Sequence, residues 1–206
     1  MKKYLSLIIA CVLLLCTSGC QMLTLFRFQE LETFDEKKYS AFIAKIPNTV
    51  PYSSIVGATA QFNDLMDSIS DQTTRHLLYQ PIQILYFDND SLVSFHNNCN
   101  APMKGFNLNW NYENRFSCFP PHSAVSCDTI PITLQTYQSI YPEITNDTRY
   151  TVIIFWSNML PKVSRSAIKT TFKNINNFDQ KDNTSVFLIN NDKFYIELNK
   201  EESQKD

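Results

Sequence analysis

The stretch from Tyr150 to Phe172 constrains the fold most, because an apolar run leads there directly into a helical pattern. The run from Thr151 to Trp156 has no polar residue after its first position, which is typical of a strand covered on both faces. The residues that follow form an apolar face and a basic face at helical spacing. The apolar positions are Leu160, Val163, Ala167, Ile168, Phe172 and Ile175, and the basic ones are Lys162, Arg165, Lys169 and Lys173. An amphipathic helix packed on a central strand predicts an α/β fold.

The composition is that of a chain that can bury a core, with 44% hydrophobic and 13% aromatic residues among 206. This length suits one α/β domain with an appendage, or two small domains. Only three glycines occur, and no glycine-rich phosphate-binding motif can be drawn, which argues against nucleotide binding by such loops. The net charge is −2 and there is no long basic run, so nucleic acid is not expected as a partner.

The first twenty residues have the pattern of an export signal. Lys2 and Lys3 precede an apolar run from Leu5 to Leu15, and small residues then lead to Cys20. The apolar run is shorter than the roughly 20 residues that a membrane-spanning helix needs. The pattern therefore predicts a leader that directs the chain out of the cytoplasm.

The last four residues of this segment, Thr17-Ser18-Gly19-Cys20, resemble the lipobox of bacterial lipoproteins. The resemblance implies that the Cys20 thiol receives a diacylglyceryl group and that the leader is cut just before it. Thr17 departs from the family, which most often has leucine there. Gln21 does not match the aspartate that signals inner-membrane retention, so the resemblance implies an outer-membrane anchor facing the periplasm. An ordinary secreted protein cut nearby, or an uncleaved anchor, is the alternative.

Around the central strand, hydrophobic periodicity and turn residues predict a helical region followed by a mixed sheet with flanking helices. Helices are expected over residues 35–46, 55–78 and 134–141, strand pairs over 82–87 with 92–95, 106–112 with 115–119 and 184–189 with 193–198, and a loop over 120–131. The predicted divisions are a signal peptide 1–19, a tether 20–34, a helical region 35–80, a mixed α/β domain 81–199 and a charged tail 200–206. An α+β arrangement is the alternative fold class.

The segment from Pro131 to Leu198 resembles the thioredoxin fold, because a short helix, a strand ending in Phe155-Trp156 and a long amphipathic helix precede another strand. In that family a Cys-x-x-Cys pair follows the tryptophan. Ser157 and Leu160 stand at those two positions here. The resemblance therefore implies a divergent thioredoxin-like core without the usual dithiol chemistry.

Three cysteines lie beyond Cys20, namely Cys99, Cys118 and Cys127. Cys118 and Cys127 are close in the sequence, and outside the cytoplasm they are expected to form a structural disulfide that contributes about 2 to 3 kcal/mol. A redox-active version of the same pair is the alternative. It is less expected, because neither cysteine has the Cys-x-x-Cys spacing that lowers a thiol pKa.

A metal site is a second hypothesis for the same region. His96 and Cys99 form one candidate pair, and Cys118 and His122, followed by Cys127, form another. Sulfur and imidazole ligands of this kind suit a tetrahedral zinc or a copper ion. The two halves fall in different predicted hairpins, so we expect the histidines to be ordinary loop residues and no cofactor to be bound.

Motifs for hydrolytic chemistry are missing from the sequence, since no nucleophile elbow or zinc-protease motif can be read. Ser157 is expected to cap the following helix. The alternating amides Asn107, Asn109 and Asn111 are expected to line the solvated side of a strand, or alternatively to contact carbohydrate or peptide.

These observations together favour a lipid-anchored protein of the cell envelope with a non-catalytic binding or structural role. Its expected partners are the membrane, through the N-terminal lipid, and another envelope protein or a cell-wall component. The alternative is a metal-binding or thiol-redox protein that uses Cys99, Cys118 and Cys127 with His96 and His122.

Overall fold

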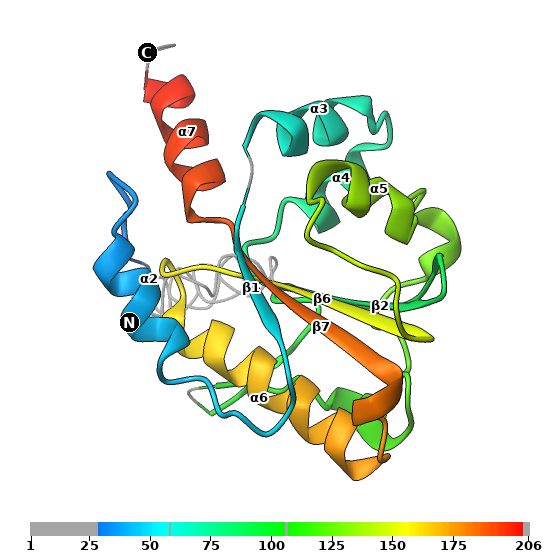
Figure 1. The fold of residues 1–206 in the computed structure, drawn as a ribbon. Helices are drawn as coiled ribbons and strands as arrows, with labels where there is room; N and C mark the ends of the chain where they lie inside the picture. The colour runs from blue at the N-terminus through cyan, green and yellow to red at the C-terminus, as the bar shows by residue number, and fades with distance from the viewer. Residues whose placement is uncertain (1–28, 58, 106, 204–206) are drawn as a thin grey trace, which may run out of the picture.

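The computed structural model describes residues 29–203 except 58 and 106 (Figure 1). The predicted leader 1–19, the lipidation site Cys20 and most of the predicted tether lie outside the described residues. Among the helices of the described part, none is long and apolar enough to cross a membrane.

A five-stranded mixed sheet forms the centre of the molecule, in the order β1-β7-β6-β2-β3. Its strands are β1 (Ser53–Val56), β2 (Gln83–Asp88), β3 (Ser91–Asn97), β6 (Tyr150–Trp156) and β7 (Thr184–Asn190). The three strands β1, β7 and β6 run parallel, whereas β2 is antiparallel to both β6 and β3. Every residue of β6 is buried, which confirms the predicted central strand.

Helices cover both faces of the sheet (Figure 1). They are α2 (Glu36–Ile43), α3 (Ala60–Ser68), α4 (Gln72–Leu78), α5 (Leu134–Ile140), α6 (Pro161–Asn177) and α7 (Asp192–Ser203). Neighbouring residues of β6 point to opposite faces: Phe155 packs against Phe62 of α3 and Tyr137 of α5, while Trp156 stacks on Phe42 of α2. The predicted α/β class with a mixed sheet and flanking helices is confirmed.

The elements with strong periodicity are those that the sequence predicted correctly. The hairpin β2–β3, the helix α5 and the unit β6-α6-β7 all lie where expected, within a few residues. The apolar positions of α6 face the sheet and are buried, and its basic positions lie on the other side.

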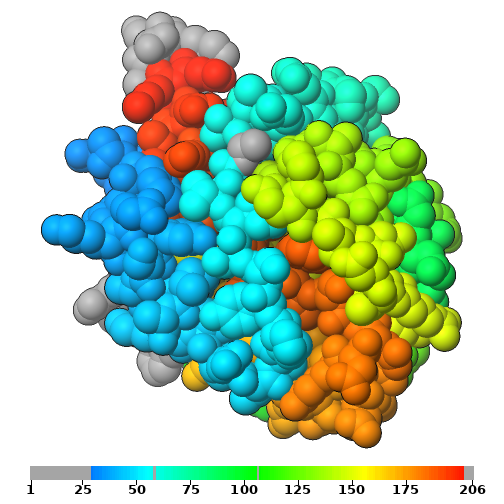
Figure 2. Space-filling view, viewed as in Figure 1, coloured from blue at the N-terminus to red at the C-terminus, as the bar shows by residue number. Residues whose placement is uncertain are grey.

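The helix predicted over residues 55–78 is wrong at its start and in its middle. Residues Ser53–Val56 form β1, an edge strand that lies at the surface of the molecule (Figure 2). Gly57 then donates its backbone N–H to Asn190 O at 2.7 Å, which continues the pairing with β7. The helical remainder is divided into α3 and α4, because Ile69 at the end of α3 is extended and Asp71 caps α4 through Thr74 N.

The hairpin predicted over 106–119 is also wrong. Only a two-residue pair forms there, β4 (Met103–Lys104) with β5 (Asn107–Leu108), and a 3-10 helix, η2 (Tyr112–Ser117), follows. The amide of Asn111 is used locally, since its Oδ1 accepts from Phe116 N at 2.8 Å. Of the amide row, only Asn107 therefore lies on a strand, β5, and local side-chain bonding has replaced the predicted ladder at Asn111.

The strand predicted over 193–198 is a helix, α7, which extends through Lys200 to Ser203. A short apolar run such as Phe194 to Ile196 fits either a strand or a helix by periodicity alone. Here Phe194 packs edge-on against Phe62, and the hydroxyl of Tyr195 donates to Tyr79 O, so tertiary contacts accompany the helix.

Candidate functional site

The carboxyl ends of the parallel strands β6 and β7 lie side by side, and a buried carboxylate joins the two turns that follow them. Asp192, only 3% exposed, begins α7. Its Oδ1 accepts from Ser157 Oγ at 2.6 Å and from Asn158 N at 2.8 Å, and its Oδ2 accepts from Asn158 Nδ2 at 2.8 Å. We call Ser157, Asn158 and Asp192 the turn clamp.

Backbone contacts strengthen the same junction. Asn191 N donates to Trp156 O at 3.0 Å, and Asp192 N donates to Asn190 Oδ1 at 3.2 Å. The position of Asp192 at the start of α7 also suits its charge, because the helix N-terminus carries partial positive charge. The clamp thus satisfies a buried carboxylate with hydrogen-bond donors alone.

Gly57 brings the end of β1 to the same place. A Cβ atom at this position would lie 2.6 Å from Asn190 O, closer than a Cβ carbon can approach a backbone oxygen. Glycine is therefore required here by the close approach of two backbones. The carboxyl ends of β1, β7 and β6 meet around one point, which is where α/β sheets commonly bind ligands.

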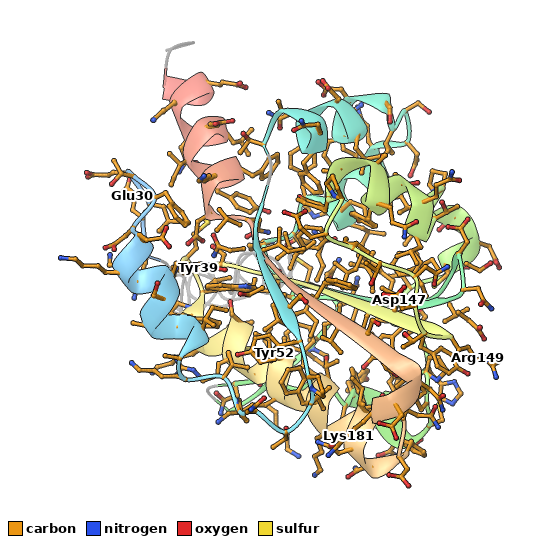
Figure 3. The ribbon with its side chains drawn as sticks, in the orientation of Figure 1. Glu30, Tyr39, Tyr52, Asp147, Arg149 and Lys181 are labelled. Carbon is orange, nitrogen blue, oxygen red and sulfur yellow. The ribbon has the colours of Figure 1, made fainter. Side chains whose placement is uncertain are left out.

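A cavity of about 230 Å³ opens over the turn clamp. It is lined by Glu30, Leu31, Glu32, Thr33, Asp35, Lys38, Asn158 and Asp192. The acidic side chains outnumber the single lysine, whose Nζ lies 4.0 Å from Asp35 Oδ2. Glu30 lies on the segment that precedes α2, on the side where α7 begins (Figure 3). We call this space the acidic cavity; its lining offers mainly hydrogen-bond acceptors.

The two positions matched to redox cysteines are both buried, and neither presents a reactive group. Ser157 is 0% exposed and Leu160 is 1% exposed. Ser157 does not cap α6, which was the expectation. Leu160 is the N-cap residue, and the Ser157 hydroxyl bonds Asp192 instead. Ser164 Oγ closes the turn by donating to Ser157 O at 2.8 Å.

The disulfide expected between Cys118 and Cys127 is not formed in the structure, where both are free cysteines. Each sulfur has a local partner: Cys118 Sγ lies 3.3 Å from Pro120 O, and Cys127 Sγ lies 3.3 Å from Ser123 Oγ. Burial raises the pKa of the Cys127 thiol, an effect that the hydrogen bond from Ser123 partly offsets. A raised thiol pKa argues against a redox role.

The candidate metal ligands do not converge. His96 is not the loop residue that was expected, because it is buried in β3, where Ser94 Oγ lies 3.1 Å from its Nε2. Burial together with the charge of Arg115 lowers the pKa of His96 to about 3. His122 is exposed, and Cys99 Sγ lies 2.9 Å from Gln80 Oε1. Within the part of the chain that the structure describes, no three histidine, cysteine or acidic side chains are grouped to hold a metal ion.

Cys118 and His122 do share a second cavity, of about 290 Å³, beside the edge strand β3. Its other lining residues are Asp88, Val93, Phe119, Pro120, Pro121 and Ser123.

Comparison with protein-family models, with curated proteins and with solved structures finds no match to this chain.

The sequence predicts that Ser157 lies at the carboxyl end of the central strand, but it does not predict the hydrogen bond to Asp192. Asp192 was interpreted as one residue of a hairpin turn, Asn190 to Asp192. No local pattern relates positions 157 and 192, and only the parallel pairing of β6 and β7 brings them together. The usable signal was the burial of both strands, which predicts that the turns at their carboxyl ends are neighbours.

Proposed function

We propose that the chain is a lipid-anchored protein of the cell envelope with a non-catalytic binding role, built on a thioredoxin-like scaffold without a redox dithiol. The anchor is proposed on the pattern that ends at Cys20. The described chain enters the body beside the candidate site, since Gln29 N donates to Met159 O at 3.0 Å. A lipid at Cys20 would hold this side of the molecule close to the membrane.

The thioredoxin-like assignment rests on the unit β6-α6-β7, on the tryptophan that ends β6 and on the central sheet. Its three parallel strands continue into an antiparallel pair, β2 and β3. The chain order departs from the family, in which the antiparallel pair follows this unit, whereas here β2 and β3 precede it. We therefore propose a rearranged rather than a typical member.

One observation carries the non-catalytic role. At the place where a thioredoxin-like enzyme carries its dithiol, Ser157 is held by Asp192 and Leu160 belongs to the core. Every side-chain polar atom of the turn clamp for which a bond is described is bonded within the clamp or to a backbone N–H. The clamp is suited to fixing the floor of a binding site and is not suited to donating a nucleophile.

The binding site that we propose is the acidic cavity. Its excess of carboxylates favours a partner that presents hydrogen-bond donors with positive charge, such as a lysine or arginine side chain of another envelope protein. The alternative use of Cys99, Cys118, Cys127, His96 and His122 is not proposed further, because Cys118 and His122 share a cavity but no third described ligand joins them.

Membrane fractionation tests the anchor. The wild-type chain should sediment with membranes and resist extraction by high salt, whereas Cys20→Ser should be released or keep its leader. A Cys20→Ser variant that partitions and is processed like the wild type would reject lipidation at this residue.

Site-specific photo-crosslinking tests the acidic cavity in intact cells. A photoreactive residue in place of Thr33, on the rim, should give a discrete adduct, while one in place of Asp147, outside the cavity lining, should not. Neutralising Glu30, Glu32 and Asp35 together to glutamine or asparagine should abolish the Thr33 adduct. An adduct of unchanged yield in that variant would show that the acidic lining is not the binding site.

A further inference from the structure

We infer that the exposed face of α6 lies against an anionic lipid surface beside the N-terminal anchor. This inference rests on the proposed anchor at Cys20, and it adds an orientation and a lipid preference. It begins from the charge of α6, whose 17 residues contain four cationic side chains and no acidic one. The residues are Lys162, Arg165, Lys169 and Lys173.

The lysines of this set form one exposed stripe. Lys162, Lys169 and Lys173 are separated by seven and four residues, so they share a face of the helix, and all three are exposed. Buried residues of α6 occupy the opposite face against the sheet. Among the described residues, none of these cations forms a salt bridge. We call Lys162, Lys169 and Lys173 the basic stripe.

The stripe does not serve the stability of the helix. Arg165, Lys169 and Lys173 are spaced by four residues, and like charges at this spacing destabilise a helix by about 0.2 to 0.5 kcal/mol per pair. Lys162 also lies in the first turn, where the helix dipole disfavours a cation. Arg165 is partly buried with its guanidinium 5.5 Å from the centre of the Phe42 ring, which leaves the stripe lysines as the exposed charges.

The course of the chain determines which anionic partner is within reach. Gln29 bonds Met159, two residues before α6 begins. Gln29 is nine positions after Cys20. An extended chain covers at most about 3.5 Å per position, or roughly 30 Å over this distance. A 17-residue helix is about 25 Å long. A lipid at Cys20 can therefore lie under any part of α6.

Each basic residue close to an anionic bilayer contributes about 1 kcal/mol to the free energy of binding. This corresponds to about a fivefold increase in the population of the bound orientation per lysine. A single anchor leaves a protein free to rotate on the membrane, and the basic stripe would select one orientation. In that orientation α6 faces the bilayer and α7 projects away from it, since the two helices lie on opposite sides of the molecule (Figure 1).

Lysine acetylation footprinting of the full membrane-extracted protein tests this orientation. The protein is reconstituted in vesicles of phosphatidylcholine alone or with 30% phosphatidylglycerol, and acetylation is followed by peptide mass spectrometry. In the anionic vesicles the basic stripe should react about fivefold more slowly, and 0.5 M salt should restore the rate. Lys200, exposed on α7, serves as the internal control and should react equally in both.

Equal rates for the stripe in both vesicles, or protection that survives high salt, would overturn the inference. Protection in native membranes but not in phosphatidylglycerol vesicles would overturn it too, by indicating another anionic component. The intact mass of the same sample reports separately whether Cys20 carries a lipid. A non-acylated chain whose stripe is still protected would therefore reject the anchor while leaving the lipid contact standing.

Discussion

The turn clamp and the cysteine-bearing region of residues 96–127 differ in where their polar and reactive side chains find hydrogen-bond partners. In the clamp, Ser157, Asn158 and Asp192 come from two distant segments and bond one another. In the cysteine-bearing region, Cys118, Cys127 and the β3 residue His96 each bond a near neighbour in the chain. Residue types alone therefore indicate a site in the cysteine-bearing region, whereas polar side chains from distant segments meet at the turn clamp.

The largest expected effect is a loss of stability when the carboxylate of the turn clamp is removed. Asp192→Ala removes the acceptor of three buried donors, and we expect the free energy of unfolding to fall by about 4 kcal/mol. The matched control is Asp182→Ala, at an exposed aspartate, which should change it by less than about 0.5 kcal/mol. Urea denaturation measures both. Equal stability of the two variants would show that the clamp does not hold the turns together.

Gly57→Ala tests the close approach at the same end of the sheet. The new methyl would lie 2.6 Å from Asn190 O, and moving two paired backbones apart should cost about 2 to 3 kcal/mol. Gly105→Ala is the comparison, because nothing lies within 4 Å there but its φ of 64° costs about 1 kcal/mol. Thermal unfolding would contradict this account if the Gly57 variant were the more stable of the two.

Burial of His96 on β3 makes the stability of the chain depend on pH. The pKa of His96 is lowered to about 3 in the folded chain by burial and by Arg115, and an unfolded histidine titrates near 6.5. Between these values the unfolded chain binds one more proton, so the free energy of unfolding should fall as the pH falls, by about 2 kcal/mol from pH 7 to pH 5. The slope should be lost in His96→Gln, and a slope retained in that variant would assign it to other groups.

The smallest effect concerns the thiol of Cys127 and leaves stability unchanged. Because burial raises the pKa of this thiol, its thiolate fraction at pH 8 is low. Alkylation by iodoacetamide should be several-fold slower in the native chain than in guanidinium, and it should accelerate only at higher pH. A native rate equal to the denatured rate would mean that the loop leaves the thiol in an ordinary, solvated state.

The sequence predicted the parts of the fold in which one long pattern decides the structure. The continuous apolar run of β6 and the two-sided pattern of α6 each extend over the whole element, and both were placed correctly. The wrong predictions fall on short segments whose structure is decided by tertiary contacts. Ile55 lies in a strand because β1 pairs with β7. Phe194 lies in a helix, where its ring packs on Phe62.

The candidate site was predictable only in part. The position of Ser157 after a buried strand was visible, but its bond to Asp192 depends on the register between β6 and β7. The acidic cavity depends on the segment before α2 returning to the same edge, which no local pattern indicates. The lysines of α6 are evident in the sequence, but the lipid contact proposed for them depends on where the chain enters the body, at Met159.

Intact mass after thiol trapping, measured on protein extracted from membranes under native conditions, tests the central claim most directly. We predict a chain that begins at Cys20 and carries acyl chains there, with Cys118 and Cys127 both trapped as free thiols and no metal bound. A chain without lipid at Cys20, or one with a bound metal or an easily reduced bridge between Cys118 and Cys127, would contradict a lipid-anchored, non-catalytic binding protein.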